Sequence, residues 1–247
     1  MRIGVPKEIK DQEFRVGLTP ASARELIAHG HEVYVEKNLG AGIGFDDAAY
    51  KAVGAKVLNT AKEVFAKGEM IIKVKEPQAS EYDLIEKRHT VFTYLHLAAE
   101  PKLTKALQKS KCTAIAYETV TDKFGGLPLL APMSDVAGRL SIQVGATALQ
   151  KFNGGSGVLL GGVAGVAPAR VLVIGAGRAG MNAARMAMGM EAQVTVMDKS
   201  LTRLAEINQI FGNRLITQYA LEETIASAVA ESDLVVGAVL IPGAAAP

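Results

Sequence analysis

The sequence contains one cysteine, no tryptophan and no marked excess of charge of either sign. Cys112 has no second cysteine with which to form an internal disulfide, which is typical of proteins that fold in a reducing compartment. The 27 basic and 25 acidic residues leave a formal charge of +2, and no block of basic residues alternates with aromatic ones. We therefore predict no nucleic-acid partner.

The sequence also lacks a long uninterrupted hydrophobic run. The N-terminal segment MRIGVPKEIK has no apolar core of the kind found in secretory signals, so we expect no export and a cytoplasmic location. The most hydrophobic stretch, residues 158–177, is rich in glycine and contains Pro168 and Arg170, which argues against a membrane-spanning helix. We therefore predict no membrane partner.

Residues 2–117 alternate between short β-rich runs and helical stretches. A chain of 247 residues, 49% of them hydrophobic, can bury the core of one large or two modest domains. The alternation predicts an α/β fold with a mostly parallel, doubly wound sheet, and Thr19, Pro20 and Gly30 mark the ends of its first helix. The predicted strands are residues 2–5, 32–36, 70–75, 90–95 and 113–117, and further helices are expected near residues 60–67, 80–87 and 101–110.

The second half begins with an expected helix over residues 134–152, for which Ser134 is the candidate N-cap. Glycine-rich segments at 153–157 and 161–168 then predict loops. A second βα series follows, but only four of the six strands of a dinucleotide-binding sheet are recognisable in it. Its expected strands are residues 171–175, 193–198, 214–217 and 233–240, and its expected helices lie near residues 178–189, 200–211 and 221–230.

A glycine turn lies between the first strand and the first helix of this second series. Residues 175–180 read Gly-Ala-Gly-Arg-Ala-Gly, a G-x-G-x-x-G run in the context that a dinucleotide site requires. Gly175 would permit the tight turn, Gly177 would let the backbone approach a pyrophosphate, and Gly180 would let helix and strand pack closely. The free amides of the helix N-terminus would bind the phosphates. The alternative is a glycine turn in an α/β protein that binds no nucleotide.

Asp198 ends the second strand of this series, where it would accept hydrogen bonds from the adenosine ribose. Its charge would repel a 2′-phosphate, so the sequence favours NAD over NADP, although the cation of Lys199 beside it would soften that discrimination. NAD is the one cofactor that we predict, and we predict no metal site.

Three charged residues of the first half lie near the ends of predicted strands. Lys75 and His96 lie at or just beyond carboxyl ends of strands, where parallel sheets bind ligands, and Arg15 precedes the first helix. Lys75 and Arg15 could hold a substrate carboxylate, and His96 could exchange protons near neutral pH. Each also has a structural alternative, as a solvated strand end, a surface charge and a hydrogen-bonded histidine respectively.

Longer sequence segments resemble alanine dehydrogenases along essentially the whole chain. They include IGVPKEIKDQEFRVGLTP, IIKVKEP, FTYLHLAAEP, LPLLAPMSDVAGRLSIQVGA, GVLLGGVAGVAPARVLVIGAGRAG and DLVVGAVLIPGA. The resemblance implies reversible oxidative deamination of L-alanine to pyruvate and ammonia with NAD, usually by a homohexamer. Its implied substrate-binding residues are Arg15 and Lys75, and its implied catalytic acid/base is His96. The implied cofactor-binding positions are Ser134, Gly175, Gly177, Arg178, Ala179, Gly180, Asp198, Arg203, Val239 and Leu240.

The sequence departs from the family pattern in three places. Arg178 replaces a small apolar residue of the glycine turn, and Ala245 in GAAAP replaces a lysine. The family sequence also continues beyond residue 247, with a catalytic aspartate and a segment that returns to the first domain. We therefore predict two doubly wound domains, both incomplete: a substrate and catalytic domain (1–130), and a linking helix with a Rossmann-type NAD-binding domain (131–247). The alternatives to alanine dehydrogenase are a truncated, inactive NAD-binding protein and a transhydrogenase-type relative.

Overall fold

The computed structural model describes residues 1–239 and has an α/β fold divided into two compact units, Met1–Leu129 and Leu130–Pro247. Each unit is built on a parallel sheet with helices in the crossover connections, which confirms the predicted fold class. Among the described residues, no helix is both long and apolar enough to cross a bilayer.

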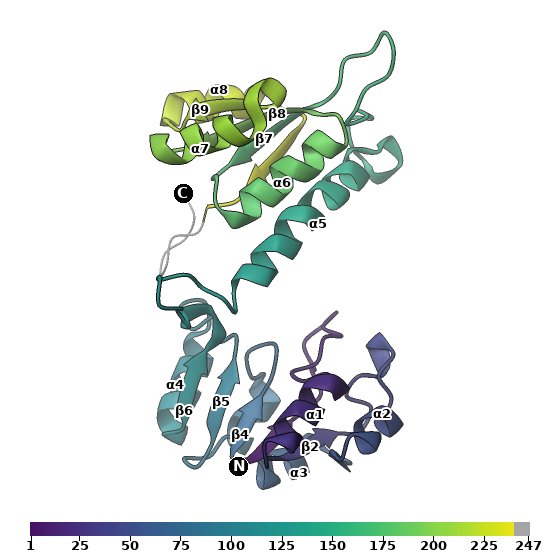
Figure 1. The fold of residues 1–247 in the computed structure, drawn as a ribbon, viewed down its shortest axis with the longest axis vertical. Coiled ribbons are helices and arrows are strands. Elements are labelled where there is room, and N and C mark those ends of the chain that lie inside the picture. The colour runs from purple at the N-terminus through teal and green to yellow at the C-terminus, as the bar shows by residue number, and fades with distance from the viewer. Residues whose placement is uncertain (240–247) are drawn as a thin grey trace. The chain divides into compact units, whose positions relative to one another are not determined.

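The first unit contains a six-stranded sheet in the order β3-β2-β1-β4-β5-β6, and all of its strand pairs are parallel. This is the doubly wound order in which the connections reverse direction between β1 and β4. The strands are β1 (Arg2–Val5), β2 (Glu32–Glu36), β3 (Lys56–Leu58), β4 (Met70–Ile72), β5 (Thr90–Thr93) and β6 (Thr113–Ala116). Strands β4, β5 and β6 lie side by side in Figure 1.

The elements of the first unit follow the predicted alternation, with three differences. In α1 the Thr19 hydroxyl accepts the Ser22 N–H at 3.2 Å, Pro20 takes the first helical position, and Gly30 follows the helix with φ of +82°. The sequence did not predict α2 and β3, and the segment expected as a helix at 80–87 is the 3₁₀ helix η2. The bounds are α1 (Pro20–Ala28), α2 (Asp47–Ala52), α3 (Ala61–Lys67), η2 (Ala79–Leu84) and α4 (Pro101–Ser110).

Two apolar clusters pack against this sheet and form the core of the first unit. One combines β-strand residues such as Val5 and Val33 with Tyr50 of α2. The other combines Val91 of β5 with buried side chains of α3 and α4. Because the strands alternate with helices along the chain, both faces of the sheet bury apolar residues.

The second unit begins with α5 (Ala131–Leu149), whose start corrects a prediction. The residue that caps the helix is Leu130, and Ser134 lies inside the first turn, where its N–H bonds the Leu130 carbonyl at 3.2 Å. The predicted N-cap role of Ser134 is therefore wrong. Pro132 is accommodated within the first turn because amides at that position need no partner inside the helix.

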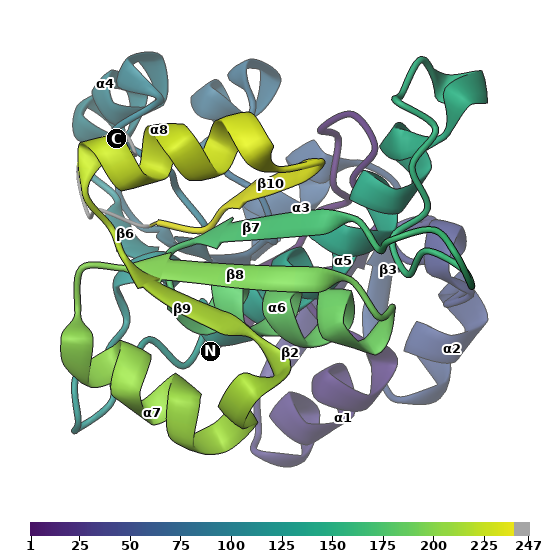
Figure 2. The same cartoon turned by 90° about the horizontal axis from the view of Figure 1, so that it is seen from above.

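The sheet of the second unit has four parallel strands in the order β10-β7-β8-β9, which run side by side in Figure 2. In the order of the chain these are strands 4-1-2-3, the first four strands of a dinucleotide-binding sheet, as predicted. The core combines buried residues of β7, β8, α5 and α6. The bounds are β7 (Arg170–Ile174), α6 (Arg178–Gly189), β8 (Gln193–Asp198), α7 (Leu201–Phe211), β9 (Ile216–Tyr219), α8 (Glu222–Glu231) and β10 (Leu234–Gly237).

Candidate substrate and nucleotide sites

The three candidate residues of the first unit follow neighbouring strands of its sheet. Arg15 lies in the segment after β1, Lys75 after β4 and His96 after β5, and these strands are adjacent in the order β1-β4-β5. Arg15 and Lys75 therefore lie on either side of the point where the doubly wound connections reverse direction. Open α/β sheets bind ligands at this point, outside the carboxyl ends of the strands.

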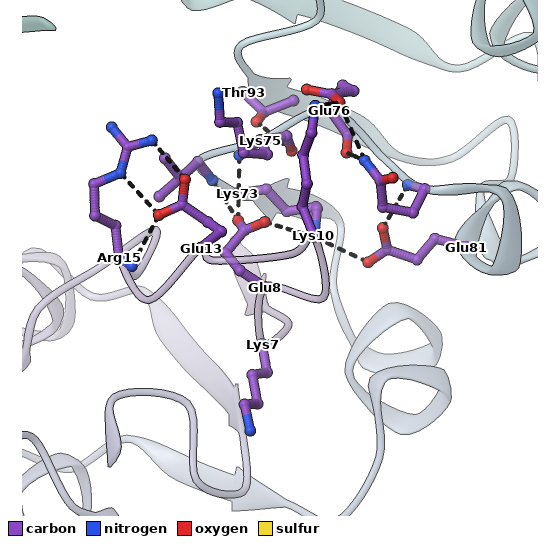
Figure 3. Close-up of polar contacts among 12 residues, drawn as sticks. Lys7, Glu8, Lys10, Glu13, Arg15, Lys73, Lys75, Glu76, Glu81 and Thr93 are labelled. Carbon is purple, nitrogen blue, oxygen red and sulfur yellow. Dashed lines mark hydrogen bonds and ion pairs between the residues drawn. The ribbon is translucent and has the colours of Figure 1, made fainter. Parts of the chain in front are cut away.

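Arg15 forms a two-point ion pair with Glu13. Its Nε donates to Oε1 at 2.8 Å and its Nη2 donates to Oε2 at 2.5 Å, while Glu13 is nearly buried (Figure 3). The hydrogen bond from Arg15 holds the pKa of Glu13 below its ordinary value, and the charge of Lys75 adds a smaller lowering. The pKa of Glu13 thus responds to both cations, to Arg15 through hydrogen bonds and charge and to Lys75 through charge alone.

The main chain that leads to Lys75 is anchored by a buried ionic group. Lys73 is fully buried between Glu8 and Glu81, with its Nζ at 3.3 Å from Glu8 Oε2 and 2.9 Å from Glu81 Oε1 (Figure 3). Burial raises the pKa of Glu8, and the charge of Lys73 offsets part of that effect. A cation without exposure to water needs such partners, so these two carboxylates stabilise the strand end that precedes Lys75.

His96 is exposed and has a left-handed backbone, with φ of +50°. Its ring stacks on that of Tyr94 at a centroid distance of 6.3 Å and an interplanar angle of 20°, and burial raises the pKa of Tyr94. The His96 N–H bonds Glu118 Oε1 at 2.7 Å. Reasoning from sequence did not single out Glu8, Tyr94 or Glu118, because their partners become neighbours only when the sheet forms.

The glycine turn of the second unit has the geometry that a dinucleotide site requires. Gly175 has φ of +100°, and a side chain there would also meet the Ala238 carbonyl oxygen at 2.8 Å. A Cβ on Gly180 would lie 1.8 Å from the Gly175 oxygen, whereas a Cβ on Gly177 would meet nothing within 4 Å. The first and third glycines are therefore required by the fold, and the middle one leaves open space beside the backbone.

Helix α6 begins directly after this turn, with Gly177 as its N-cap and no side chain bonded to the cap position. Ala179 lies in the first helical turn. Because the first amides of a helix have no partner within it, they and the helix dipole attract an anion.

Asp198 and Arg203 both form hydrogen bonds with the backbone of Ala176 in the glycine turn. Asp198 Oδ2 accepts the Ala176 N–H at 2.7 Å and its Oδ1 accepts the Ser200 N–H at 2.8 Å. Arg203 Nε donates to the Ala176 oxygen at 2.9 Å. A carboxylate has about four acceptor positions, so Asp198 can still accept hydrogen bonds from a ribose.

Arg178 is directed to helix α5 by an ion pair. Its Nε and Nη2 donate to Asp135 Oδ1 and Oδ2 at 2.7 and 2.6 Å, and this pairing lowers the pKa of Asp135. Asn182 also donates to the same carboxylate, at 2.7 Å. The arginine therefore leaves the space beside Gly177 open in this arrangement. Of the two remaining candidates, Val239 follows β10 and is partly exposed, and Leu240 lies outside the described residues.

The fold and the glycine turn define this protein as a two-unit α/β protein whose second unit is Rossmann-like, which implies a nucleotide cofactor. Within residues 1–239, no three His, Cys, Asp or Glu side chains are grouped so that they could hold a metal ion.

Comparison with known proteins shows to which family of two-unit α/β proteins the chain belongs. The family model "Alanine dehydrogenase/PNT, N-terminal domain" matches residues 4–137, and "Alanine dehydrogenase/PNT, C-terminal domain" matches residues 141–247. The chain therefore belongs to the alanine dehydrogenase/PNT family. An alanine dehydrogenase of Halomonas elongata is 55% identical over all 247 residues, which span 67% of that relative. The chain thus covers about two thirds of the length of this curated relative.

Two solved structures resemble the chain over its full length. The chain superposes on an L-alanine dehydrogenase with a TM-score of 0.92 and 52% identity, and it covers 68% of that structure. A transhydrogenase from Sinorhizobium meliloti gives a TM-score of 0.79 at 24% identity, and the chain covers 72% of it. The likeness to the L-alanine dehydrogenase holds for both sequence and fold, whereas the likeness to the transhydrogenase shows a shared fold alone.

Proposed function

We propose that this chain supplies the substrate-binding side chains and the nucleotide turn of an NAD-dependent alanine dehydrogenase. The reaction converts L-alanine, NAD and water to pyruvate, ammonium, NADH and a proton. The observation that carries the proposal is the position of Arg15 and Lys75 on either side of the reversal between β1 and β4, with His96 just after the next strand, β5. The high identity to proteins named alanine dehydrogenase supports the same reading.

Arg15 and Lys75 bind the carboxylate of alanine or pyruvate in this proposal. The ion pair with Glu13 fixes the guanidinium of Arg15, and the cation of Lys75 lies within electrostatic reach of the same carboxylate. A substrate carboxylate that approaches this pair gains two charged hydrogen-bond donors, which are stronger than neutral ones. The two cations thereby orient the α-carbon for reaction.

His96 handles the protons of the reaction. The ring is exposed to an incoming substrate and is kept in orientation by its stacking on Tyr94. NAD, when bound, would supply the hydride acceptor for the α-carbon, and the α-ammonium would release one proton to solvent as the C=N bond forms. His96 then takes a proton from the water that attacks the resulting imine, and returns it to the departing ammonia.

The nucleotide site consists, in this proposal, of the turn from Gly175 to Gly180 with Ala179 and Arg178, together with Asp198, Arg203, Ser134, Val239 and Leu240. The open space at Gly177 suits a pyrophosphate, and the carboxylate of Asp198 suits a ribose with free hydroxyls. We therefore propose that NAD is preferred to NADP. Arg178 contacts the pyrophosphate only if it exchanges Asp135 for the phosphate.

The test of this function is to separate substrate binding from turnover in the complete gene product. Lys75→Ala should raise the KM for pyruvate roughly ten- to a hundredfold, which corresponds to about 1.5–3 kcal/mol for a charged hydrogen bond. His96→Ala should lower kcat about 10²- to 10⁴-fold and leave the Kd for NAD nearly unchanged. Exposed Lys62 and His29 provide matched alanine controls. Substrate kinetics that neither variant changes would refute the proposed site.

The same preparation tests the remaining parts of the proposal. We propose a cytoplasmic homohexamer, as the family resemblance implies, and native mass spectrometry should therefore give six copies per particle. The alternative of an inactive NAD-binding protein predicts NAD binding without alanine-dependent NADH formation. A measured hydride transfer between two nicotinamide nucleotides, without alanine turnover, would instead indicate a transhydrogenase-type activity.

A further inference from the structure

We infer that Glu8 and Glu118 are positioning residues, each of which orients the backbone that presents one of the functional side chains. Each glutamate accepts hydrogen bonds from two consecutive backbone amides, and the second amide of each pair belongs to Lys75 or His96. The inference rests on the proposed function, because it assigns roles to these two residues. It adds two glutamates that would affect the reaction only by orienting Lys75 and His96.

Glu8 holds the segment that follows β4. Its Oε1 accepts the N–H of Val74 at 2.6 Å and that of Lys75 at 3.4 Å, while its Oε2 pairs with buried Lys73. The carbonyl of Lys75 is held from the other direction, by the hydroxyl of Thr93 at 2.9 Å (Figure 3). The peptide groups on both sides of the Lys75 side chain are thus fixed by residues of neighbouring strands or their loops.

Glu118 holds the segment that follows β5 in the same way. Its Oε1 accepts the N–H of Leu95 at 3.0 Å and that of His96 at 2.7 Å. His96 has φ of +50°, a conformation that residues other than glycine rarely adopt and that the surrounding structure must support. The Glu118 carboxylate, which accepts the His96 N–H, provides that support and keeps the His96 ring stacked on Tyr94.

A third glutamate, Glu63, accepts the same pair of hydrogen bonds at a place where neither backbone amide belongs to a candidate functional residue. Glu63 Oε2 accepts the consecutive amides of Asn59 and Thr60 at 2.8 and 3.2 Å, as part of the capping box of α3. Glu63 lies only a few residues from its partners and stabilises its own helix. Glu8 is 66 and 67 residues from its partners, and Glu118 is 23 and 22 residues from its own.

The two positioning residues should affect different kinetic constants. Glu8 uses one oxygen for the backbone amides of Val74 and Lys75 and the other for the Lys73 cation. Glu8→Gln has only one acceptor oxygen and cannot serve both, so it should disturb Lys75 and raise the KM for pyruvate. Glu118→Ala removes the acceptor for His96 and should lower kcat. Each change should be on the order of ten- to a hundredfold, the effect of a small misplacement of a reacting group. Glu118→Gln keeps one acceptor and should recover part of the lost kcat.

The experiment measures kcat, KM for pyruvate, Kd for NAD and Tm for these variants in the complete gene product, with Glu63→Gln as the matched control. The expected result is a larger KM effect for Glu8→Gln, a larger kcat effect for Glu118→Ala, and neither effect for Glu63→Gln. Thr93→Val removes the bond to the Lys75 carbonyl without changing any charge, and should raise KM even if Glu8→Gln fails to fold.

Two results would overturn the inference. One is unchanged kinetics in the Glu8, Glu118 and Thr93 variants. The other is a loss in which kcat and KM change together in proportion to the fall in Tm, since that pattern reports general destabilisation. Lys75→Ala and His96→Ala are measured in parallel. If these two lose function while the positioning variants do not, the inference fails alone; if these two remain fully active, the proposed function fails as well.

Discussion

Replacing Lys73 by methionine should strongly destabilise the first unit. The lysine is fully buried, and its ammonium lies at 3.3 and 2.9 Å from the carboxylates of Glu8 and Glu81, which are themselves almost inaccessible to water. Methionine fills a similar volume but leaves two buried carboxylates without their counter-charge. Breaking a buried ion pair in this way costs about 3–5 kcal/mol in the free energy of unfolding.

The loss should appear as a decrease of roughly 2 M in the urea midpoint, if the urea dependence is about 2 kcal/mol per M. Tyrosine fluorescence is a suitable signal, because five of the six tyrosines lie in the first unit and the chain has no tryptophan. Exposed Lys62→Met is the control, with an expected change below about 0.5 kcal/mol.

Neutralising the stranded carboxylates gives a second test of the same reasoning. Adding Glu8→Gln and Glu81→Gln to Lys73→Met should recover part of the lost stability, because no unpaired charge then remains buried. A loss below about 1 kcal/mol for Lys73→Met alone would refute the assignment of a buried ionic group.

Three further predictions concern the nucleotide site and the pH dependence of stability. Gly177→Val should leave Tm almost unchanged, since a Cβ there meets nothing within 4 Å, but it should abolish NAD binding in calorimetry; retained affinity would place the nucleotide elsewhere. Asp198→Ala should reduce the preference for NAD over NADP by at least about tenfold, because a charge-assisted hydrogen bond is worth about 1.5–3 kcal/mol; equal NAD and NADP affinities before mutation would contradict this role. Burial lowers the pKa of His89 below 6.5, so the unfolded chain binds the proton more readily and stability should fall as pH decreases through and below that value. His89→Gln keeps a donor for the Phe65 carbonyl and an acceptor for the Glu86 amide but does not titrate, so its urea midpoint should decline less between pH 7 and pH 5 than that of the unchanged protein; identical declines would exclude His89 as the cause.

Local patterns determined most of the segments that form strands and helices. The runs at residues 2–5, 32–36 and 193–198 form strands with the predicted bounds, and α6 covers the predicted residues 178–189. Apolar β-branched residues between helix caps and glycines leave few alternatives for such segments. The glycine turn could also be predicted, because a strand, a helix start and an acidic strand end occur in one short stretch.

Tertiary structure decided where several elements end and what surrounds the candidate residues. The strand predicted to reach residue 75 ends at Ile72, and the next residue, Lys73, belongs to the buried ionic group. The short edge strand β3 was missed because three residues carry too weak a pattern and form a strand only by pairing with β2.

The surroundings of Lys75, His96 and Arg178 likewise depend on contacts between distant parts of the chain. Glu8 and Lys75 are separated by 67 residues and Asp135 and Arg178 by 43, so no local pattern could pair them. A sequence specifies its backbone elements largely through neighbours three or four positions away. Hydrogen bonds and ion pairs that orient a functional side chain form between adjacent strands and helices, and they exist only once those elements have packed.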